Sequence, residues 1–310
     1  MKVWILAPGE NWIVDEMAKQ FKQDNPEICT ENIAEADVVW VMSDWCFDRL
    51  PTSYLRSGKP ILTMLHHFVP TKFSGVDEDR FVFLNRHTTA FTAPNFRTKD
   101  FVDALKFVDK PVHIVPYWGH TPSWKTTGTK EELRKKHGIP VDAFVIGSWQ
   151  RDTEGHDLKS PKLEKGPDLL ADFICREHRK RAVVIGDIPK VHVLLAGWRR
   201  QYIVGRLKAE GVPYTYIELP SQEVINDLYQ VIDLYPVCSR YEGGPQALIE
   251  AGMLGIKVVS RPIGMAELVL TTHAIADDVS QAVAEVPNVY RLRTPEGHNP
   301  FIELLRKVSK

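Results

Sequence analysis

The chain has 310 residues and a formal net charge of −1, and 44% of its residues are hydrophobic. This length predicts two domains with large cores, and the near-neutral charge gives no field that favours nucleic acid as a partner. Four widely spaced cysteines without a Cys-x-x-Cys pair, no apolar run near the ~20 residues of a membrane span and no signal peptide predict a cytoplasmic protein.

Short apolar runs alternate with helical segments through residues 1–120, the predicted first domain. We expect helices at Ile13–Lys22 and Thr98–Phe107, where Thr98 is the expected N-cap. The alternation of strands and helices predicts a parallel sheet with helices on both faces. The expected strands are Val3–Ala7, Val38–Met42, Ile61–Leu65, Phe81–Leu84 and Val112–Pro116.

A polar segment, residues 121–129, is interpreted as a linker to a second domain that we expect to span residues 130–295. The second domain also alternates strands and helices, and Ser221 is the expected start of one of these helices. The expected strands are Phe144–Gly147, Val191–Ala196, Tyr214–Ile217, Leu234–Cys238 and Ile256–Ser260. The expected helices include Lys130–Gly138, Pro167 to about Arg179, Gln201–Glu210 and Ser221–Gln230, and a last helix lies in residues 296–310.

The strongest functional pattern lies in residues 233–268. The strand Leu234–Cys238 leads into a polar turn that ends in Gly243 and Gly244, and Pro245 is well placed as the first residue of a helix. A second strand follows, so the pattern predicts a strand–helix–strand unit with a parallel pair. Free N–H groups at the helix start, at the carboxyl end of the sheet, favour a phosphate or diphosphate.

Two carboxylates frame these glycines. Glu242 lies on the turn, and Glu250 lies about 7 Å along the helix from Pro245 at ~1.5 Å per residue. At that depth the Glu250 carboxylate can accept hydrogen bonds from two ribose hydroxyls. Glu242, on the other side of the phosphates, can reach the hydroxyls of a sugar.

The stretch SRYEGGPQALIEAGMLGIKVVSRPIGMAEL resembles the Glu-x7-Glu motif of retaining glycosyltransferase family 4. One departure is Cys238, where the family usually has proline. The resemblance implies an α/β chain of the GT-B fold, with two Rossmann-like domains facing each other across a cleft. It also implies that the first domain binds the acceptor, that the second binds a nucleotide sugar linked to UDP, GDP or ADP, and that residues 296–310 pack back on the first domain.

The same resemblance implies transfer of a sugar to an acceptor hydroxyl with retention at the anomeric carbon, without a metal or another cofactor. The acceptor class is left open between a glycan, a lipid-linked molecule and a small molecule. The alternatives are a catalytically silent scaffold or carbohydrate-binding subunit, and a sugar-nucleotide epimerase or hydrolase on the same fold. Release of a nucleoside diphosphate from a donor distinguishes a transferase from a silent scaffold.

Donor-binding roles follow from the resemblance for the turn and the helix. Glu250 is expected to hold the ribose, and Glu242 is expected to contact the donor sugar as a catalytic residue. The other expected donor-binding residues of this stretch are Ser239, Gly243, Gly244, Pro245 and Gln246.

The donor diphosphate needs cations, because the leaving group gains charge at the transition state. Arg151 and Lys165 match an arginine and a Lys-Gly pair of the family and are the expected catalytic cations. A charged insertion, Asp152–Pro161, lies between them, so Lys159 and Lys162 remain alternatives to Lys165. The opposing interpretation is that these are solvated loop charges.

Two further positions lie at strand ends of the first domain. His66 resembles a family histidine that contacts the donor sugar, and it is included among the catalytic residues. A structural histidine or a general base, which would fit an inverting mechanism, are the alternatives. Gly9 lies in the first strand-to-helix loop, where the backbone of a GT-B enzyme approaches the phosphates or the acceptor, and it is included in the donor-binding set.

The sequence Asp77-Glu78-Asp79 matches the metal-binding signature of the other glycosyltransferase fold. It lies in an expected turn before the strand predicted at Phe81–Leu84, and a metal role is rejected because nothing else fits that fold. The basic runs Arg134–His137 and Arg176–Arg181 are explained by the helix dipole, with a peripheral contact to anionic lipid as the alternative.

Overall fold

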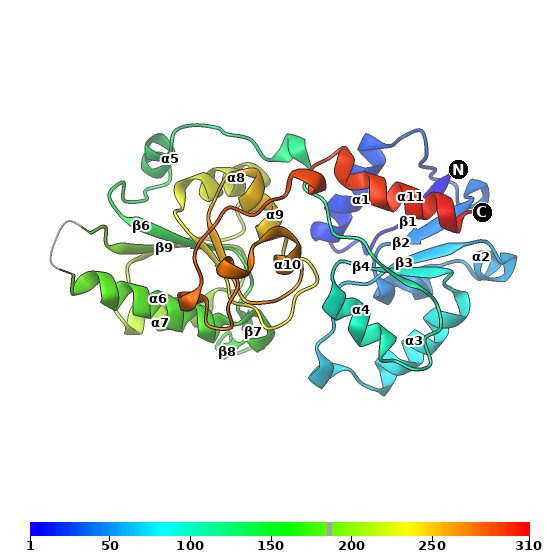
Figure 1. Ribbon diagram of the computed structural model, residues 1–310, viewed down its shortest axis with the longest axis horizontal. Coiled ribbons are helices and arrows are strands. Elements are labelled where there is room, and N and C mark those ends of the chain that lie inside the picture. The colour runs from blue at the N-terminus through cyan, green and yellow to red at the C-terminus, as the bar shows by residue number, and fades with distance from the viewer. Residues whose placement is uncertain (185–187) are drawn as a thin grey trace. The chain divides into compact units, whose positions relative to one another are not determined.

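The computed structural model describes residues 1–184 and 188–310 (Figure 1). The chain divides into two compact units. Unit 1 contains Met1–His120 and Arg291–Lys310, and unit 2 contains Thr121–Tyr290. Each unit is built around parallel strands with helices packed against them. The last helix of the chain therefore belongs to unit 1, and the polar segment 121–129 belongs to unit 2.

Unit 1 has a five-stranded parallel sheet in the order β1-β2-β3-β4-β5. Every residue of β2, β3 and β4 is buried, as expected for a parallel sheet that is covered on both faces. The strands are β1 (Val3–Leu6), β2 (Val38–Val41), β3 (Ile61–Met64), β4 (Ala90–Ala93) and β5 (Val112–Ile114). Four of them confirm predicted strands to within two residues at each end.

Figure 1 shows α1 and α11 on one side of this sheet and α3 and α4 on the other. On the first side, the Trp40 ring lies 5.0 Å from the ring of Phe21 in α1 and 5.0 Å from that of Phe301 in α11. On the second side, Phe81 and Val102 belong to the apolar cluster that contains the other face of β2. The helices are α1 (Ile13–Asp24), α2 (Thr52–Ser57), α3 (Gly75–His87), α4 (Phe96–Asp103) and α11 (Asn299–Val308).

The strand predicted at Phe81–Leu84 is wrong, because these residues lie in the middle of α3. A short apolar run does not distinguish a buried strand from one turn of a buried helix. The helix begins where the side chain of Asp77 accepts a hydrogen bond from the backbone N–H of Ser74, at 2.8 Å. The remaining strand of the sheet is instead β4, which follows α3 along the chain.

The start of α4 also differs from the prediction. The N-cap is Asn95, whose side-chain oxygen accepts a hydrogen bond from the backbone N–H of Thr98 at 2.9 Å. Thr98 is therefore the third residue of the helix, and the helix ends at Asp103 rather than at Phe107. Asn and Thr are both good N-caps, so the sequence alone does not decide whether the helix is capped by Asn95 or by Thr98, three residues later.

Unit 2 contains a parallel sheet in the order β10-β9-β6 and a parallel pair, β11 and β12. A bridge between Ile146 of β6 and Leu234, just before β11, joins the two. All five strands confirm predicted ones to within two residues at each end. They are β6 (Phe144–Ser148), β9 (Val191–Ala196), β10 (Tyr214–Ile217), β11 (Tyr235–Val237) and β12 (Val258–Ser260).

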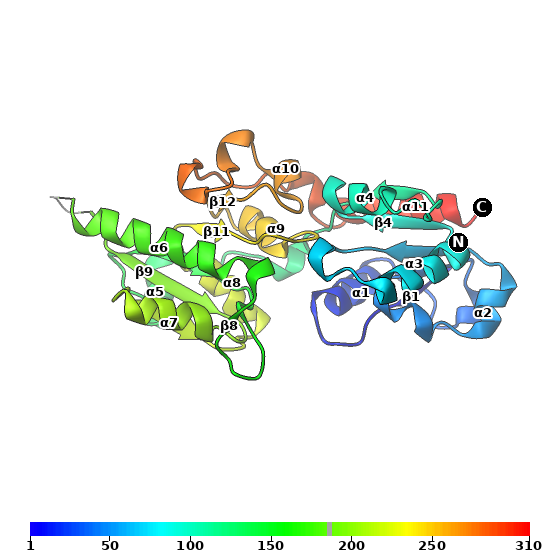
Figure 2. The ribbon, with the colours of Figure 1, turned by 90° about the horizontal axis from the view of Figure 1, so that it is seen from below.

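In Figure 1, α6 and α7 lie below β6 and β9, and α8 lies above them. Figure 2, the view from below, shows α6 and α7 side by side on their face of the sheet. Leu170 of α6 and Ile203 of α7 are fully buried in the same apolar cluster as Val193 of β9. Ser221 caps α8 as predicted, because its hydroxyl oxygen accepts a hydrogen bond from the N–H of Val224 at 3.3 Å. The helices are α5 (Lys130–Lys136), α6 (Pro167–Ala182), α7 (Gln201–Ala209), α8 (Gln222–Val231), α9 (Gln246–Met253) and α10 (Ala266–Val269).

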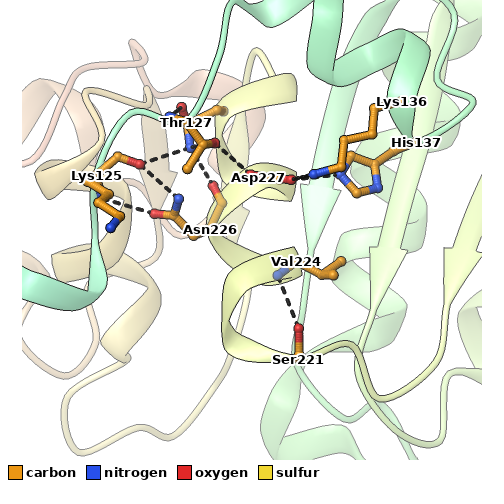
Figure 3. Close-up of polar contacts among 9 residues, drawn as sticks. Lys125, Thr127, Lys136, His137, Ser221, Val224, Asn226 and Asp227 are labelled. Carbon is orange, nitrogen blue, oxygen red and sulfur yellow. Dashed lines mark hydrogen bonds and ion pairs between the residues drawn. The ribbon is translucent and has the colours of Figure 1, made fainter.

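The segment 121–129 is fastened to α8 (Figure 3). The side chain of Asn226 accepts a hydrogen bond from the N–H of Lys125 at 3.1 Å and donates one to its carbonyl at 2.8 Å. The Thr127 hydroxyl donates to Asp227 at 2.6 Å. These contacts hold the segment that the sequence predicts as a linker against unit 2.

Asp227 links this segment to α5. It also accepts a hydrogen bond from the Lys136 ammonium at 2.6 Å and lies 3.0 Å from Nε2 of His137. Burial raises the pKa of the Asp227 carboxyl, but the hydrogen bonds from Lys136, Thr127 and His137 prevail and lower it to about 2. The carboxylate therefore stays ionised at neutral pH and holds three parts of unit 2 together.

Candidate active site

Most of the predicted site residues of unit 2 lie in the segments that follow β6 and β11, and Gln246 and Glu250 lie in α9. These loops leave the carboxyl ends of parallel strands, which is where ligands bind in open α/β sheets. Each loop leads toward a helix or a hairpin, so its polar side chains are placed by the regular elements on either side.

Glu242 is held in place by two partners. Its Oε2 lies 2.7 Å from Nζ of Lys165, and its Oε1 accepts a hydrogen bond from the Ser239 hydroxyl at 3.0 Å. The side chains of Lys165 and Glu242 are only 19% and 13% exposed. The structure thus brings together the carboxylate predicted to contact the donor sugar and a cation predicted to contact the diphosphate.

Gly166 explains how Lys165 comes so close to the turn. It has φ of +61°, and a Cβ atom at this position would lie 2.0 Å from the carbonyl oxygen of Cys238. Only glycine permits that approach. Gly166 is also the N-cap of α6, and Pro167 is its first residue, so the helix starts directly behind the lysine.

The charged insertion folds into a hairpin. β7 (Thr153–Glu154) pairs with β8 (Ser160–Pro161) in antiparallel fashion, and the N–H of Lys162 donates to the carbonyl of Asp152 at 2.8 Å. The two ends of the insertion, Asp152 and Lys162, therefore lie side by side. Lys159 is exposed on the hairpin and Lys162 pairs with Glu164 at 3.5 Å, so Lys165 is the one of the three lysines beside Glu242.

Gln150 connects the loop after β6 to Lys165 and to Ser239. Its Nε2 donates to the Lys165 carbonyl at 2.6 Å, and its Oε1 lies 3.0 Å from the Ser239 hydroxyl oxygen, whose single proton it shares with Glu242. The next residue, Arg151, donates from Nε to the carbonyl of Thr153 at 3.0 Å, and its guanidinium lies 5.1 Å from the ring centre of Trp198. Arg151 is therefore held on the side of β9, and Lys165 on the side of β11.

Glu250 points from α9 to α8, where it accepts a hydrogen bond from the Tyr229 hydroxyl at 2.6 Å. Burial raises the pKa of the Glu250 carboxyl to about 7, and the hydrogen bond from Tyr229 only partly opposes this shift. Tyr229 is fully buried, with the rings of Trp124, Trp149 and Tyr235 at 5.6, 5.4 and 5.6 Å. The Glu250 side chain is itself partly buried beside this aromatic cluster.

The glycine turn differs from the prediction by one residue. Pro245 is the N-cap of α9, and the helix begins at Gln246. A Cβ on Gly264, which has φ of +54°, would lie 2.6 Å from Cδ of Pro245 and 3.0 Å from the carbonyl of Gly243. The loop after β12 therefore packs directly on the turn, and it requires glycine to do so.

His66 in unit 1 is enclosed by hydrogen bonds. Its Nε2 lies 2.8 Å from the Met42 carbonyl, which can only accept, so Nε2 carries the proton. Its Nδ1 lies 2.5 Å from the Tyr117 hydroxyl and accepts from it. Burial lowers the pKa of His66 to about 4. The ring is neutral at pH 7, and neither nitrogen is free to take a proton from an acceptor.

The loop of Gly9 is closed by a carboxylate from its own unit. The backbone N–H groups of Gly9, Glu10 and Trp12 donate to Asp15 at 2.6, 2.9 and 3.2 Å. Burial opposes ionisation of Asp15, but these backbone hydrogen bonds prevail and lower its pKa. The N–H groups that a phosphate would need in this loop are already paired with a negative charge.

Comparison with known proteins identifies the fold. No protein-family model matches the chain, and no curated protein matches it. Anabaena HepE in complex with UDP matches with a TM-score of 0.71 and 14% identity, over 100% of this chain and 92% of its own. Its complex with UDP-glucose matches with a TM-score of 0.69 and 14% identity, over 99% and 91%. This likeness shows the GT-B fold.

A second solved structure supports the same fold. A UDP-forming α,α-trehalose-phosphate synthase from Burkholderia xenovorans matches with a TM-score of 0.64 and 11% identity, over 99% of this chain and 94% of its own. The α/β fold class of the GT-B type predicted from the sequence is thereby confirmed. At these identities the likeness extends to the fold, and the roles of individual residues rest on their geometry.

Neither a cluster of metal ligands nor a membrane-spanning helix is found in the described part of the chain. In residues 1–184 and 188–310, no three His, Cys, Asp or Glu side chains lie together as a metal site. Asp77 is the third residue of α3, where it pairs with Arg80 at 2.8 Å, so it does not lie in the expected turn. No helix within the same ranges combines the length and the apolar character needed to cross a bilayer.

Sequence reasoning missed four residues that shape the site. Gln150, Trp198 and Gly264 each follow a strand end within four residues, so a survey of every strand end at the carboxyl edge would have found them. Tyr229 gave no such signal. It lies inside α8, and its contact with Glu250 depends on how two helices pack.

Proposed function

We propose that this protein is a glycosyltransferase that moves a sugar from a nucleotide-sugar donor to an acceptor hydroxyl, with retention at the anomeric carbon and without a metal. Unit 2 binds the donor. The observation that carries the proposal is the cluster of Lys165, Glu242 and Ser239 at the start of α6, with Glu250 on the adjacent α9. Opposite charges at a helix N-terminus suit a ligand with a diphosphate and a hydroxyl-rich sugar.

In this proposal the diphosphate binds between the two cations of the site. Lys165 reaches it from the start of α6, and Arg151 reaches it from the loop after β6. The glycines Gly243 and Gly244 let the backbone come close to its oxygens. All these groups are fixed before the reaction, so they stabilise the charge that develops on the leaving group without reorganising.

Glu242 contacts the hydroxyls of the donor sugar, and Glu250 accepts hydrogen bonds from the ribose. The raised pKa of Glu250, about 7, describes the carboxyl before a ligand donates hydrogen bonds to it. Hydroxyl donors favour the ionised form and lower the pKa on binding. Nucleotide binding is therefore coupled to loss of a proton from Glu250.

The bond that forms joins the acceptor oxygen to the anomeric carbon, and the bond that breaks joins that carbon to the leaving phosphate. The phosphate oxygen takes the acceptor proton, so the net charge is conserved. The geometry of His66 supports this assignment, because both ring nitrogens are engaged and the pKa is about 4. A general-base role for His66 would need one of these hydrogen bonds to break.

Uridine diphosphate is the first nucleotide to test. The solved structures of HepE with UDP and with UDP-glucose support this choice, since they share the fold at nearly full coverage. The acceptor is a glycan, a lipid-linked molecule or a small molecule.

The test is calorimetric titration with UDP, GDP and ADP, followed by measurement of nucleoside diphosphate release from the matched sugar donor with a panel of acceptors. Binding of one nucleotide with release in the presence of EDTA is the expected result. Failure of all three to bind overturns the proposal. Binding without release from any donor would instead favour a carbohydrate-binding or silent scaffold.

A further inference from the structure

Arg200, the residue before α7, is a fully buried arginine at the carboxyl edge of the sheet of unit 2. Its Nε donates to Oδ2 of Asp152 at 2.5 Å. Nη1 donates to the carbonyls of Ser148 and Ala196 at 2.5 and 2.7 Å, and Nη2 donates to the Ser148 hydroxyl at 2.9 Å. One guanidinium thus joins the last residues of β6 and β9.

Stability alone does not account for this pair. The Asp152 and Arg200 side chains are both 0% exposed, and removing two charges from water carries a large desolvation penalty. A pair of apolar residues of similar volume often stabilises a core equally well or better. What the ion pair adds is direction, because a planar guanidinium with fixed partners sets the relative position of two strand ends.

Asp152 passes this constraint on to the loop that carries Arg151. Its Oδ1 accepts a hydrogen bond from the Thr153 hydroxyl at 2.7 Å, and the Thr153 carbonyl accepts from Nε of Arg151 at 3.0 Å. The carbonyl of Asp152 also accepts from the N–H of Lys162, which closes the inserted hairpin. The buried ion pair is therefore connected, through Asp152 and Thr153, to the side chain of Arg151.

The loop after β9 completes the support. The Trp198 ring lies 5.1 Å from Cζ of Arg151 and 4.4 Å from Cζ of Arg199. Gly197 has φ of +93°, and a Cβ there would lie 2.6 Å from the carbonyl of Trp149. The loops after β6 and β9 are thus in backbone contact just where Arg151 stacks on Trp198.

We propose that Arg200 and Asp152 are positioning residues that set the guanidinium of Arg151 for the donor diphosphate. The proposal rests on the proposed function for the identity of the ligand. Arg200 orders the ends of β6 and β9, Asp152 and Thr153 fix the side chain of Arg151 from below, and Trp198 supports its face. Neither Arg200 nor Asp152 touches the ligand, because both are buried beneath the loop.

The test compares UDP with uridine, which lacks phosphates, by calorimetric titration. The variant Asp152→Leu/Arg200→Met removes the ion pair and keeps the core apolar, and Arg151→Ala removes the cation itself. We expect each to weaken UDP affinity by about tenfold or more, with uridine affinity within about twofold of wild type. Adding Arg151→Ala to the paired variant should cause no further loss, because both changes remove the same contact.

A matched control is Arg134→Met/Asp233→Leu, which removes another ion pair of unit 2, between Nη2 of Arg134 and Asp233 at 2.8 Å. Asp233 accepts from the N–H of Val145 at the start of β6, so this pair lies at the opposite edge of the sheet. It should leave UDP affinity unchanged. Should the paired Asp152 and Arg200 variant not fold, Asp152→Asn and Arg200→Lys serve in its place, with the same selective loss expected.

Unchanged UDP affinity in folded variants, equal loss of UDP and uridine, or losses that multiply with Arg151→Ala would each overturn the positioning role. These results differ from failure of the proposed function, in which the wild-type chain would bind none of the nucleoside diphosphates.

Discussion

Units 1 and 2 use the same architecture but treat the carboxyl edge of the sheet differently. In unit 1, the loop after β1 donates its N–H groups to Asp15, and His66 after β3 has a partner on each ring nitrogen. In unit 2, the turn after β11 places the carboxylate of Glu242 against the ammonium of Lys165, and Arg151 lies on an aromatic ring.

The difference lies in what a ligand can displace. The polar groups of the unit 1 loops are satisfied by groups of their own unit, and a phosphate there would compete with a carboxylate. In unit 2, a phosphate can bind the lysine while a sugar hydroxyl binds the glutamate, so each charge exchanges one partner for another. This contrast favours unit 2 as the donor-binding unit.

The largest expected effect comes from Gly166, which allows the close approach on which the site of unit 2 depends. Gly166→Ala places a Cβ 2.0 Å from the carbonyl oxygen of Cys238 at φ of +61°. Backbone strain and overpacking together should lower the free energy of unfolding by about 3 kcal/mol or more. Urea denaturation measures this change.

Gly211→Ala is the matched control in the same unit. Gly211 also has a positive φ, +65°, but nothing lies within 4 Å of its added Cβ. The conformational term alone should cost about 1–2 kcal/mol. Equal losses for the two variants would mean that the approach of Gly166 to Cys238 relaxes easily and does not define the site.

The second effect concerns Glu250. Glu250→Ala should weaken binding of uridine as well as UDP, because the ribose is common to both. Loss of a charged hydrogen-bond acceptor corresponds to ~1.5–3 kcal/mol of binding free energy. Titration calorimetry with both ligands measures it, and unchanged affinity for both would remove Glu250 from the donor site.

Much of this fold could be predicted from the sequence, because the parallel strands of both units are continuous apolar runs bounded by turn residues. The strand missed in unit 1, β4, has the sequence AFTA, whose run is short and contains a threonine. The motif predicts Glu242 for the donor site and leaves Lys159, Lys162 and Lys165 as candidates for the diphosphate, but it does not predict the ion pair between Lys165 and Glu242. The contact of Glu250 with Tyr229 and the enclosure of His66 could not be predicted, since both depend on side-chain packing between separate elements.

Glu242 tests whether the charged turn of unit 2 acts on the reacting sugar. Glu242→Gln keeps the shape and removes the charge, so UDP affinity should stay near the wild-type value or rise, because Lys165 loses a carboxylate that competes with the phosphate. Turnover should fall at least about tenfold, which corresponds to about 1.4 kcal/mol of transition-state stabilisation. Steady-state release of UDP from the sugar donor measures the loss.

The control is Glu164→Gln, which removes a nearby carboxylate that lies 3.5 Å from Nζ of Lys162. It should leave turnover unchanged. Loss of UDP binding together with turnover in Glu242→Gln would show that Glu242 holds the loop, and full activity would exclude it from the reaction.

The pH dependence of nucleoside binding provides a finer comparison. Burial raises the pKa of Glu250 to about 7, and only the ionised carboxylate accepts hydrogen bonds from both ribose hydroxyls. The bound state therefore has a lower pKa, so affinity rises with pH and levels off above about 7. Uridine should bind about five- to tenfold more weakly at pH 6 than at pH 8.

Uridine is the suitable ligand because a terminal phosphate itself titrates near pH 6. In Glu250→Gln the affinity should be independent of pH across this range. If the uridine affinity of Glu250→Gln still changed with pH, the titrating group would be a residue other than Glu250.

The smallest effect concerns Asp15, which closes the loop of Gly9 in unit 1. Asp15→Ala frees the N–H groups of Gly9 and Glu10 and removes a carboxylate from the first turn of α1. The loss should resemble that of a helix cap, about 1 kcal/mol in the free energy of unfolding. Asp77→Ala in α3 is the matched control, since Asp77 also accepts a backbone N–H at the start of its helix. UDP affinity should be the same in both variants as in the wild type.

A change in UDP affinity for Asp15→Ala alone would mean that the loop of Gly9 contacts the diphosphate, and the contrast between the two units would no longer hold.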